Sequence, residues 1–317
     1  MKAPQTLQEA IIYFANADNC IAYMVAHRWP EGVSCPNCGR AEVTWLANQK
    51  KWQCKSAHAK RQFTAKVGTI FEDSPLGLEK WLPAVWLIGN AKNGISSCEL
   101  ARALGVTQKT AWFMLHRIRK AMQNGSMLKM GGPGSNGVEV DETFIGGKAR
   151  NMHIGKRQRR ITGTGTKDKI AVMGILERGG QVRATIVPSR RKPTLQAEVR
   201  KHVEAGTALY TDALLSYEGL AADYAHAVVD HAVEYVNGQI HTNGLENFWS
   251  LLKRGISGTY VSVEPFHLFR YLDEQTFRYN NRLGMNDAAR FSAILSQVAG
   301  KRLTFAEVTG KVGETIN

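Results

Sequence analysis

The sequence has no apolar run that approaches the ~20 residues of a bilayer-spanning helix. Its first residues, MKAPQTLQEAIIYFANADN, lack the basic stretch followed by a long apolar stretch that marks a secretory signal. We also find no internal repeat. These absences predict a protein that does not enter a membrane and is located in the cytoplasm.

Cysteine is scarce and odd in number, at five residues. Cys35, Cys38 and Cys54 fall in the first fifth of the chain, which indicates metal binding in a reducing compartment and argues against disulfides. We expect Cys20 and Cys98 to be small, buried apolar residues.

Acidic residues are also in deficit, because 27 Asp and Glu face 41 Lys and Arg. The net charge is +14 and the isoelectric point is about 9.6. This excess is larger than solubility alone requires, and it favours a polyanion, most simply nucleic acid, as the partner.

The amino-acid composition and the predicted secondary structure change along the chain. The glycine-rich stretch MGGPGSNG at 130–137 is the clearest domain boundary. After it, GVEVDETFIG, KIAVMGILERGG, QVRATIVPS and ALYTD are typical of strands, and PTLQAEVRKHVEAG of a helix. We predict five regions: an N-terminal helix at 1–25, a metal-binding ribbon at 26–73, a helical domain at 78–126, a mixed α/β domain at 137–282 and a helical tail at 283–317.

The motif Cys35-Pro-Asn-Cys38-Gly places two thiolates on a tight turn, where both can bind one ion. Cys54 and His58 follow at a spacing that suits a second knuckle, with Cys-x3-His in place of Cys-x2-Cys. These four residues predict a Cys3His zinc ribbon. The alternatives are a degenerate ribbon without metal, or a surface histidine at 58.

The stretch ISSCELARALGVTQKTAWFMLHRIRKAM, at 95–122, is typical of a helix-turn-helix. Gly105 permits the sharp turn, and Thr107 can cap the second helix. Its polar first turn would face base edges. The residues predicted on its outer side are Gln108, Lys109, His116, Arg117, Arg119 and Lys120. Any helical hairpin with a glycine turn could show the same pattern.

Three acidic residues form a second candidate metal site. Asp141 ends an expected strand, on one face with Glu139 and Thr143, and Asp212 follows the strand ALYTD. Glu246 lies 34 residues later on an expected helix. Each has a structural alternative: Asp141 as a solvated strand end, Asp212 as a helix cap, and Glu246 in a capping box.

Together, the three acids favour a site for a pair of divalent cations, and their hard oxygen ligands suit Mg²⁺. Lys253 lies seven residues after Glu246 and so on the same helix face, where it can contact a DNA phosphate. Trp249 shares this face, where it can either pack in the core or, like Tyr260, stack on an unpaired base.

With these motifs in hand, the sequence resembles the DDE-type transposases of bacterial insertion sequences that carry an N-terminal zinc ribbon. The resemblance covers about residues 15–282, and its most specific pieces are CPNCG, GTIFEDS, VDETFIGGK, YTDALLSY, HTNGLENFWSLLKRGISGTY and FRYNNR. It implies an α+β multidomain protein with a zinc ribbon, a helix-turn-helix domain and a ribonuclease-H-like mixed α/β catalytic domain. It implies Asp141, Asp212 and Glu246 as ligands of Mg²⁺ or Mn²⁺, with Lys253 on the phosphate. Because the third position varies in this group, Asn243 and Asn247 compete with Glu246.

The implied activity is metal-dependent cleavage at the element's ends and strand transfer into target DNA. The alternatives are an inactive DNA-binding regulator derived from a transposase, and a nuclease of the same fold. The basic segment 148–169 is expected to order against DNA phosphates. The predicted DNA contacts are Gln108, Lys109, Arg117, Lys156, Arg157, Arg159, Arg160, Lys253 and Arg254. We expect double-stranded DNA, terminal repeats and target alike, as the partner, a homodimer or larger assembly on it, and a location at the bacterial nucleoid.

Overall fold

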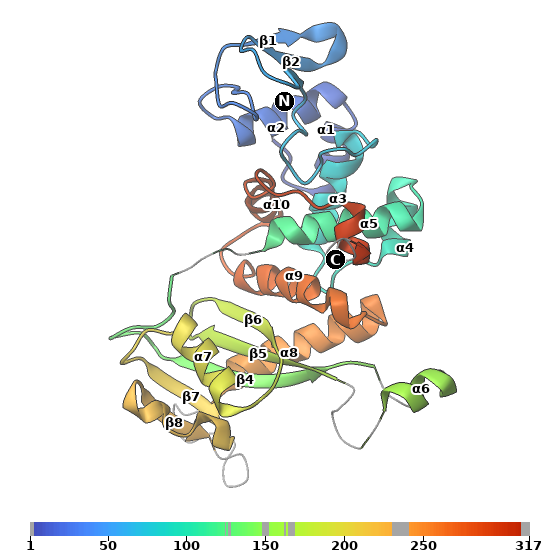
Figure 1. Ribbon diagram of the computed structural model, residues 1–317. Coiled ribbons are helices and arrows are strands. Elements are labelled where there is room, and N and C mark those ends of the chain that lie inside the picture. Colours follow the sequence, from blue (N-terminus) through green and yellow to red (C-terminus); the bar gives the residue numbers. More distant parts are fainter. Residues whose placement is uncertain are drawn as a thin grey trace. The chain divides into compact units, whose positions relative to one another are not determined.

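The computed structural model describes residues 3–123, 125, 128–147, 152–161, 163, 169–229 and 241–311 (Figure 1). The chain forms two compact units. The first comprises residues 1–123 together with 283–317, and the second comprises residues 124–282. The C-terminal tail therefore belongs to the same unit as the N-terminal residues.

The first unit begins with two helices in place of the single expected one. The break falls at Asn16, whose side chain accepts a hydrogen bond from the N–H of Asp18 and so starts a new helix. Helix α1 spans Leu7–Phe14 and α2 spans Ala17–Arg28. A small antiparallel sheet follows, made of β1 (Val43–Leu46), β2 (Lys51–Cys54) and β3 (Gln62–Phe63), with the 3-10 turn η1 (Ala47–Gln49) between its first two strands.

The remaining helices of the first unit form one cluster, in which α4, α5 and α10 contact α3, and α11 contacts α5. They are α3 (Leu78–Asn90), α4 (Ser97–Leu104), α5 (Gln108–Met122), α10 (Asp287–Leu295) and α11 (Phe305–Thr309). Trp81 and Trp86 on α3 are buried, and Trp86 contacts Phe291 of α10 with ring centroids 5.0 Å apart. This aromatic contact anchors the C-terminal residues to the helical part of the unit.

The second unit is built on a five-stranded sheet in the order β6-β5-β4-β7-β8. Its strands are β4 (Val138–Ile145), β5 (Ile170–Glu177), β6 (Val182–Val187), β7 (Ala208–Asp212) and β8 (Ala225–Val229). Strands β4, β5 and β6 are antiparallel to one another, whereas β7 pairs in parallel with both β4 and β8. The four strands expected from the sequence are present, and β8 is an additional one.

Helices cover both faces of this sheet (Figure 1). On one face, α7 (Lys192–His202) and the 3-10 turns η3 (Leu215–Tyr217) and η4 (Leu220–Ala222) bury Val138 and Val140. On the other, α8 (Asn243–Gly255) and α9 (Leu268–Asn280) pack over Val172 and Leu176. Two short turns, the π-helical η5 (Ile256–Tyr260) and the 3-10 turn η6 (Pro265–His267), join α8 to α9. Helix α6 (Ile154–Arg160), between β4 and β5, stands away from the sheet in Figure 1.

The glycine-rich stretch at 130–137 packs onto the second unit instead of forming a free linker. Met130 pairs with Val203, and the N–H of Gly132 donates to the Thr207 hydroxyl at 2.9 Å. A Cβ at Gly131 would lie 2.5 Å from the Thr207 side chain, so the glycine is needed for this close approach. Across the described ranges, no helix is both long and apolar enough to cross a membrane.

Candidate functional site

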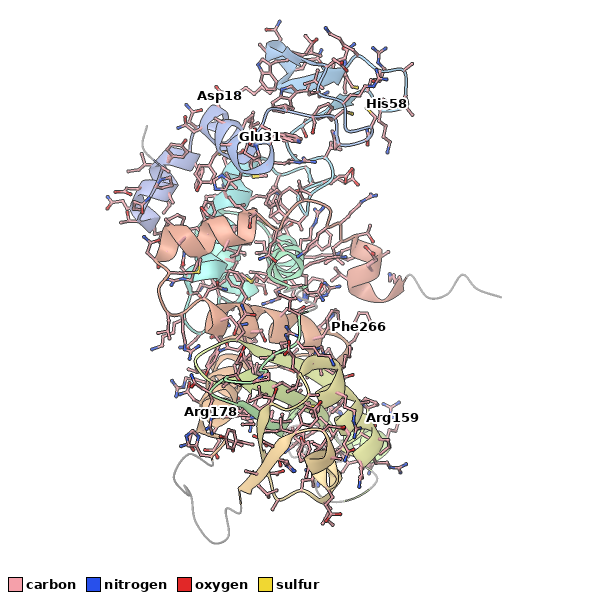
Figure 2. All side chains as sticks on the ribbon, turned by 90° about the vertical axis from the view of Figure 1, so that its left-hand side faces the viewer. Asp18, Glu31, His58, Arg159, Arg178 and Phe266 are labelled. Atoms are coloured by element: carbon pink, nitrogen blue, oxygen red, sulfur yellow. The ribbon has the colours of Figure 1, made fainter. Side chains whose placement is uncertain are left out.

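Cys35, Cys38, Cys54 and His58 converge at the end of the small sheet, and Figure 2 labels His58 there. Their ligand atoms all lie within 4.8 Å of one another. The Cys38 and Cys54 sulfurs are 3.6 Å apart, and the Cys35 sulfur is 3.5 Å from His58 Nε2. A tetrahedral zinc site with Zn–S of about 2.3 Å and Zn–N of about 2.0 Å requires separations of about 3.8 and 3.5 Å. The four residues therefore fit Zn²⁺.

The electrostatics of this cluster favour the thiolate that zinc binds. Burial disfavours the charged form of Cys54, but hydrogen bonds from the Ser56 N–H and from His58 outweigh it and lower the pKa of Cys54 to about 6. The Ala59 carbonyl lies 2.6 Å from His58 Nδ1, and this contact raises the pKa of His58. It also leaves Nε2 facing the cysteines, as a metal ligand must. Cys20 is buried as expected, whereas Cys98 is exposed.

Helices α4 and α5 form the hairpin that the sequence predicts. Gly105 ends α4 with φ of 63°, and the Thr107 side chain caps α5 through the N–H of Thr110. At the start of α5, Gln108 and Lys109 are exposed. Gln108 donates to the Ser97 hydroxyl at 2.7 Å. The first turn of α5 is therefore open to a partner.

Arg117 was predicted on the outer side of α5, but the structure buries it. The side chain is 3% exposed, donates to the Glu72 carbonyl, and lies over the rings of Trp81 and Phe113 at 5.5 and 5.3 Å. The apolar stem of arginine and its affinity for aromatic faces make this burial possible. His116 and Arg119, also predicted outward, are buried.

Part of the basic segment is visible as helix α6. Arg157 and Arg159 are exposed on it, and Figure 2 shows Arg159 on the outside of its unit. The side chains of Lys156 and Arg160 lie outside the described residues, as do residues 148–151 and 164–168. The described part of the segment thus presents cations to solvent.

The sheet brings Asp141 and Asp212 together. Val140 of β4 is paired with Thr211 of β7 in parallel register, so the next residue on each strand is one of the two aspartates. Neighbouring positions on parallel strands point to the same face, about 4.8 Å apart. Asp141 is not at a strand end as expected, because β4 continues to Ile145. It lies where the pairing of β4 with β7 stops, and Asp212 Oδ1 there accepts from the Leu214 N–H at 3.2 Å.

Helix α8 brings Glu246 and Trp249 to the same place. The Trp249 indole N–H donates to Asp141 Oδ2 at 2.9 Å, and the Glu142 N–H donates to Oδ1 at 2.7 Å. Glu246 lies one helical turn before Trp249, close enough for its charge to raise the pKa of Asp141. Trp249 is only 4% exposed, so it packs in the core and is not available to stack on a base.

Gly174 makes this arrangement possible. It lies on β5, is paired with Asp141 on β4, and lies beneath the indole of Trp249. A Cβ at Gly174 would lie 2.6 Å from Trp249 Cζ2 and 2.8 Å from Leu245 Cδ2. The missing side chain is therefore the space that the indole fills. This glycine carries no signal in the sequence, because its partner Trp249 lies 75 residues away.

We expect Gly174→Ala to lower the free energy of unfolding by about 1–3 kcal/mol, because overpacking forces the indole off Asp141. Thermal unfolding and tryptophan fluorescence measure the change. Gly155→Ala on α6 is the matched control, since a Cβ there meets nothing within 4 Å. A Gly174→Ala protein as stable as this control would contradict the packing argument.

Negative charge is concentrated at the site. Burial raises the pKa of Asp141 to about 6, and the charges of Asp212 and Glu246 add to it, against the Trp249 hydrogen bond. Burial, together with the charges of Asp212 and Asp141, raises the pKa of Glu142 to about 8, whereas Arg190 opposes this rise. Glu142 is a fourth carboxylate that sequence analysis did not assign. It follows Asp141 directly on β4 and is close enough to both aspartates for their charges to act on it.

The donor set fits a hard divalent cation, because it offers carboxylate oxygens whose mutual repulsion a cation relieves. Within the described residues, the Cys/His group alone has ligand atoms gathered closely enough to hold an ion as they stand. Asp141 and Asp212 follow directly on paired residues of neighbouring strands, and Glu246 is near enough for its charge to act on Asp141. Lys253, Arg254, Asn243 and Asn247 are all exposed on α8.

The two parts described above, a Cys/His ribbon and a mixed α/β domain, both correspond to known families. Residues 15–59 match the transposase zinc-ribbon domain, and residues 133–280 match the ISXO2-like transposase domain. An uncharacterized protein in transposable element ISH50 of Halobacterium salinarum is 30% identical over 246 residues, which cover 73% of this chain and 80% of that protein. The chain therefore belongs to the ISXO2-like transposase family.

A second relative is an uncharacterized transposase-like protein of Haemophilus influenzae. It is 28% identical over 102 residues, which cover 32% of this chain and 82% of that protein. No solved structure is significantly similar to the chain.

Proposed function

We propose that this protein is an active DNA transposase that cuts the ends of its element and joins them to target DNA. The observation that carries the proposal is the parallel register of β4 and β7, which sets Asp141 beside Asp212, with Glu246 facing them from α8. Three carboxylates from separate elements, converging at one sheet edge, suit a two-cation site for phosphoryl transfer.

The order and directions of the strands support a ribonuclease-H-like assignment. Three antiparallel strands, β4 to β6, form one side of the sheet, and β7 and β8 extend it in parallel with β4. Helices lie on both faces, and the acids gather at the edge where β7 ends. In an open sheet with parallel strands, this carboxyl-terminal edge is where ligands bind.

Mg²⁺ held by Asp141, Asp212 and Glu246 would stabilise the charge on the attacking and leaving oxygens. Water attacks a phosphodiester at the element's end, breaks the P–O3′ bond, and leaves a 3′ hydroxyl and a 5′ phosphate. That hydroxyl then attacks a target phosphodiester and displaces a second 3′ oxygen, which takes up a proton. Because each step is a direct displacement, no residue needs to bond covalently to DNA.

The cationic groups of the chain divide between the two units. On α8, Lys253 lies two turns after Glu246 and is exposed, so it can contact a phosphate next to the scissile bond. Arg254, Arg157 and Arg159 are further exposed cations of the same unit. In the other unit, the open first turn of α5, with Gln108 and Lys109, suits the major groove as the second helix of a helix-turn-helix. Joining two element ends further requires at least a dimer on DNA.

Purified protein, a supercoiled donor plasmid carrying the sequences that flank the gene, and Mg²⁺ test the proposal. We expect joined products in which element ends are linked to target DNA, detected by gel electrophoresis and sequencing of the junctions. Cutting without joining would identify a nuclease of the same fold. Specific DNA binding without either reaction would identify an inactive regulator.

A further inference from the structure

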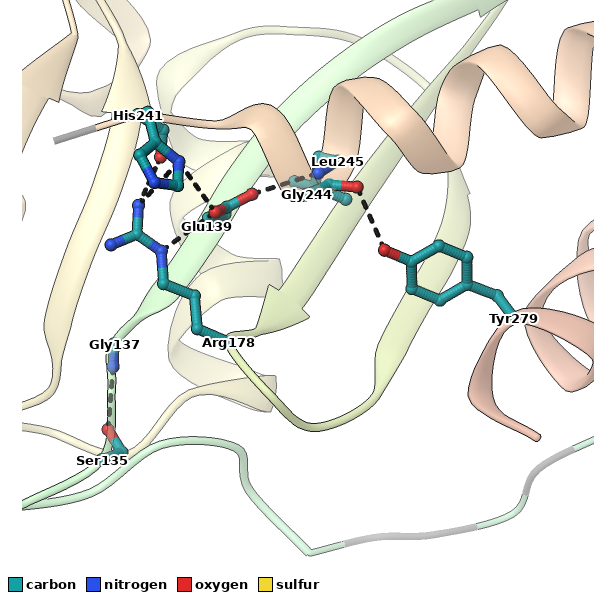
Figure 3. Close-up of polar contacts among 8 residues, drawn as sticks. All are labelled: Ser135, Gly137, Glu139, Arg178, His241, Gly244, Leu245 and Tyr279. Atoms are coloured by element: carbon teal, nitrogen blue, oxygen red, sulfur yellow. Dashed lines mark hydrogen bonds and ion pairs between the residues drawn. The ribbon is translucent and has the colours of Figure 1, made fainter. Parts of the chain in front are cut away.

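Glu139 is a buried residue of β4 whose carboxylate lies against the beginning of α8, and it takes no part in the proposed reaction steps. Its side chain is 1% exposed, and it lies two residues before Asp141 on the same face of β4. Figure 3 shows it between Arg178, His241 and the first turn of α8. A buried charge is costly unless it is paired and hydrogen-bonded, so these contacts deserve an explanation.

The Glu139 carboxylate is satisfied on both oxygens. Oε1 accepts from Arg178 Nε at 2.9 Å and lies 3.4 Å from His241 Nδ1. Oε2 accepts from the backbone N–H of Leu245 at 3.0 Å (Figure 3). Arg178 also donates to the His241 carbonyl at 2.6 Å and lies over the Tyr210 ring at 3.9 Å. Glu139 on β4 is therefore bonded directly to the residues that open α8, and Arg178, which follows β5, adds a contact to Tyr210 on β7.

The beginning of α8 depends on this contact. Thr242, at the N-cap, makes no capping hydrogen bond with its own side chain. Glu139, which lies on β4, caps the helix in its place by accepting from the Leu245 N–H. Its carboxylate also interacts favourably with the positive end of the helix dipole. A Cβ at Gly244 would lie 2.8 Å from Glu139 Oε2, so the close approach requires glycine. The Tyr279 hydroxyl holds the same turn by donating to the Gly244 carbonyl at 3.2 Å.

Both ends of the contact between Glu139 and Leu245 lie close to the proposed metal ligands in the sequence. Glu139 is separated from Asp141 by one residue, and Leu245 immediately precedes Glu246. One carboxylate thus fixes the register between the strand that carries the first acid and the helix that carries the third. We propose that Glu139 is a positioning residue, which sets α8 against β4 so that Glu246 and Asp141 can share metal ions. This inference rests on the proposed transposase function.

Glu139→Gln, in the full zinc-loaded chain, tests the inference, because it keeps the shape but removes the charge that holds Arg178 and the helix. We expect Mn²⁺ affinity, measured by electron paramagnetic resonance, to fall about tenfold, as for other groups that orient metal ligands. We expect the Mg²⁺ concentration for half-maximal strand transfer to rise in parallel, and KM for DNA to stay unchanged. Val199→Ala, in the core on the opposite sheet face, is the control for general destabilisation.

The outcomes separate the two ideas. If the unmodified protein neither binds Mn²⁺ nor joins DNA, the proposed function fails. If it does both, and Glu139→Gln binds Mn²⁺ as tightly as the Val199→Ala protein at a similar Tm, the positioning role is overturned. Should Glu139→Gln not fold, Glu139→Asp decides, because it keeps the charge but draws the carboxylate back from the Leu245 N–H. A two- to threefold loss of Mn²⁺ affinity then supports the inference, and an unchanged affinity overturns it.

Discussion

Asp141→Asn or Asp212→Asn should reduce strand transfer by about a thousandfold or more. An amide keeps the size of the side chain but removes the negative charge that holds the cation, and the cation's contribution to the transition state is several kcal/mol. DNA binding is assigned to exposed lysine and arginine side chains and not to these two aspartates. The affinity for element-end DNA should therefore change less than about twofold. The rate of joining and the affinity measured by fluorescence anisotropy report these two effects separately.

The third ligand can be identified in the same assay. Glu246 faces Trp249 and Asp141, whereas Asn247, two residues before Trp249, points to the opposite side of α8. Glu246→Gln should therefore lose activity like the aspartate variants, and Asn243→Ala and Asn247→Ala should retain most of it.

Asp223→Asn is the charge control for this series. Asp223 is an exposed acid, paired with Arg200 at 2.9 Å. Its replacement should leave joining unchanged. Strand transfer that persists in both Asp141→Asn and Asp212→Asn would overturn the assignment of the site, as would an inactive Asn247→Ala with an active Glu246→Gln.

Cys54→Ser should remove zinc from the ribbon and unfold the small sheet. Three strands this short bury little apolar surface, so the metal must supply most of their stability, and structural zinc contributes about 10–16 kcal/mol in zinc-finger peptides. Zinc content, measured with a colorimetric chelator after denaturation, should fall from one ion per chain to none. Amide signals from β1 to β3 should collapse towards random-coil positions.

Cys98→Ser provides the comparison for the ribbon experiment, because Cys98 is an exposed free thiol outside the cluster. It should keep one zinc ion per chain and a folded ribbon. A strong chelator should reproduce the Cys54→Ser result in the unmodified protein. A ribbon that stays folded without metal would contradict this prediction. It would mean that Cys35, Cys38, Cys54 and His58 form a degenerate ribbon that does not need zinc.

Local patterns predicted much of the architecture. CPNCG and the Cys-x3-His pair identified four residues that the structure gathers within 4.8 Å. The stretch ALYTD matches β7 residue for residue, because β-branched and aromatic residues bounded by turns are a strong strand signal. β8 was not predicted, since AHAVV is short and alanine-rich and becomes a strand only by pairing with β7.

The features that were missed depend on tertiary contacts. Helical periodicity cannot decide whether Arg117, at the border of the apolar face, turns outward or folds over Trp81 and Phe113. Glu142 was not singled out in the sequence, because its nearness to Asp212 depends on the pairing of β4 with β7. Gly174 carries no signal of its own, because its importance is the space that Trp249 occupies.

The parallel pairing of β4 with β7 has a consequence for biosynthesis. Asp141 and Glu246 are 105 residues apart, and pairings between such distant segments form late, after the costly closure of the intervening chain. A nascent polypeptide on the ribosome therefore contains Asp141 and Asp212 before α8, which carries Glu246, has been translated. Under the proposed mechanism, premature termination upstream of α8 would release a fragment that lacks Glu246 and so cannot bind the cations needed to cut DNA.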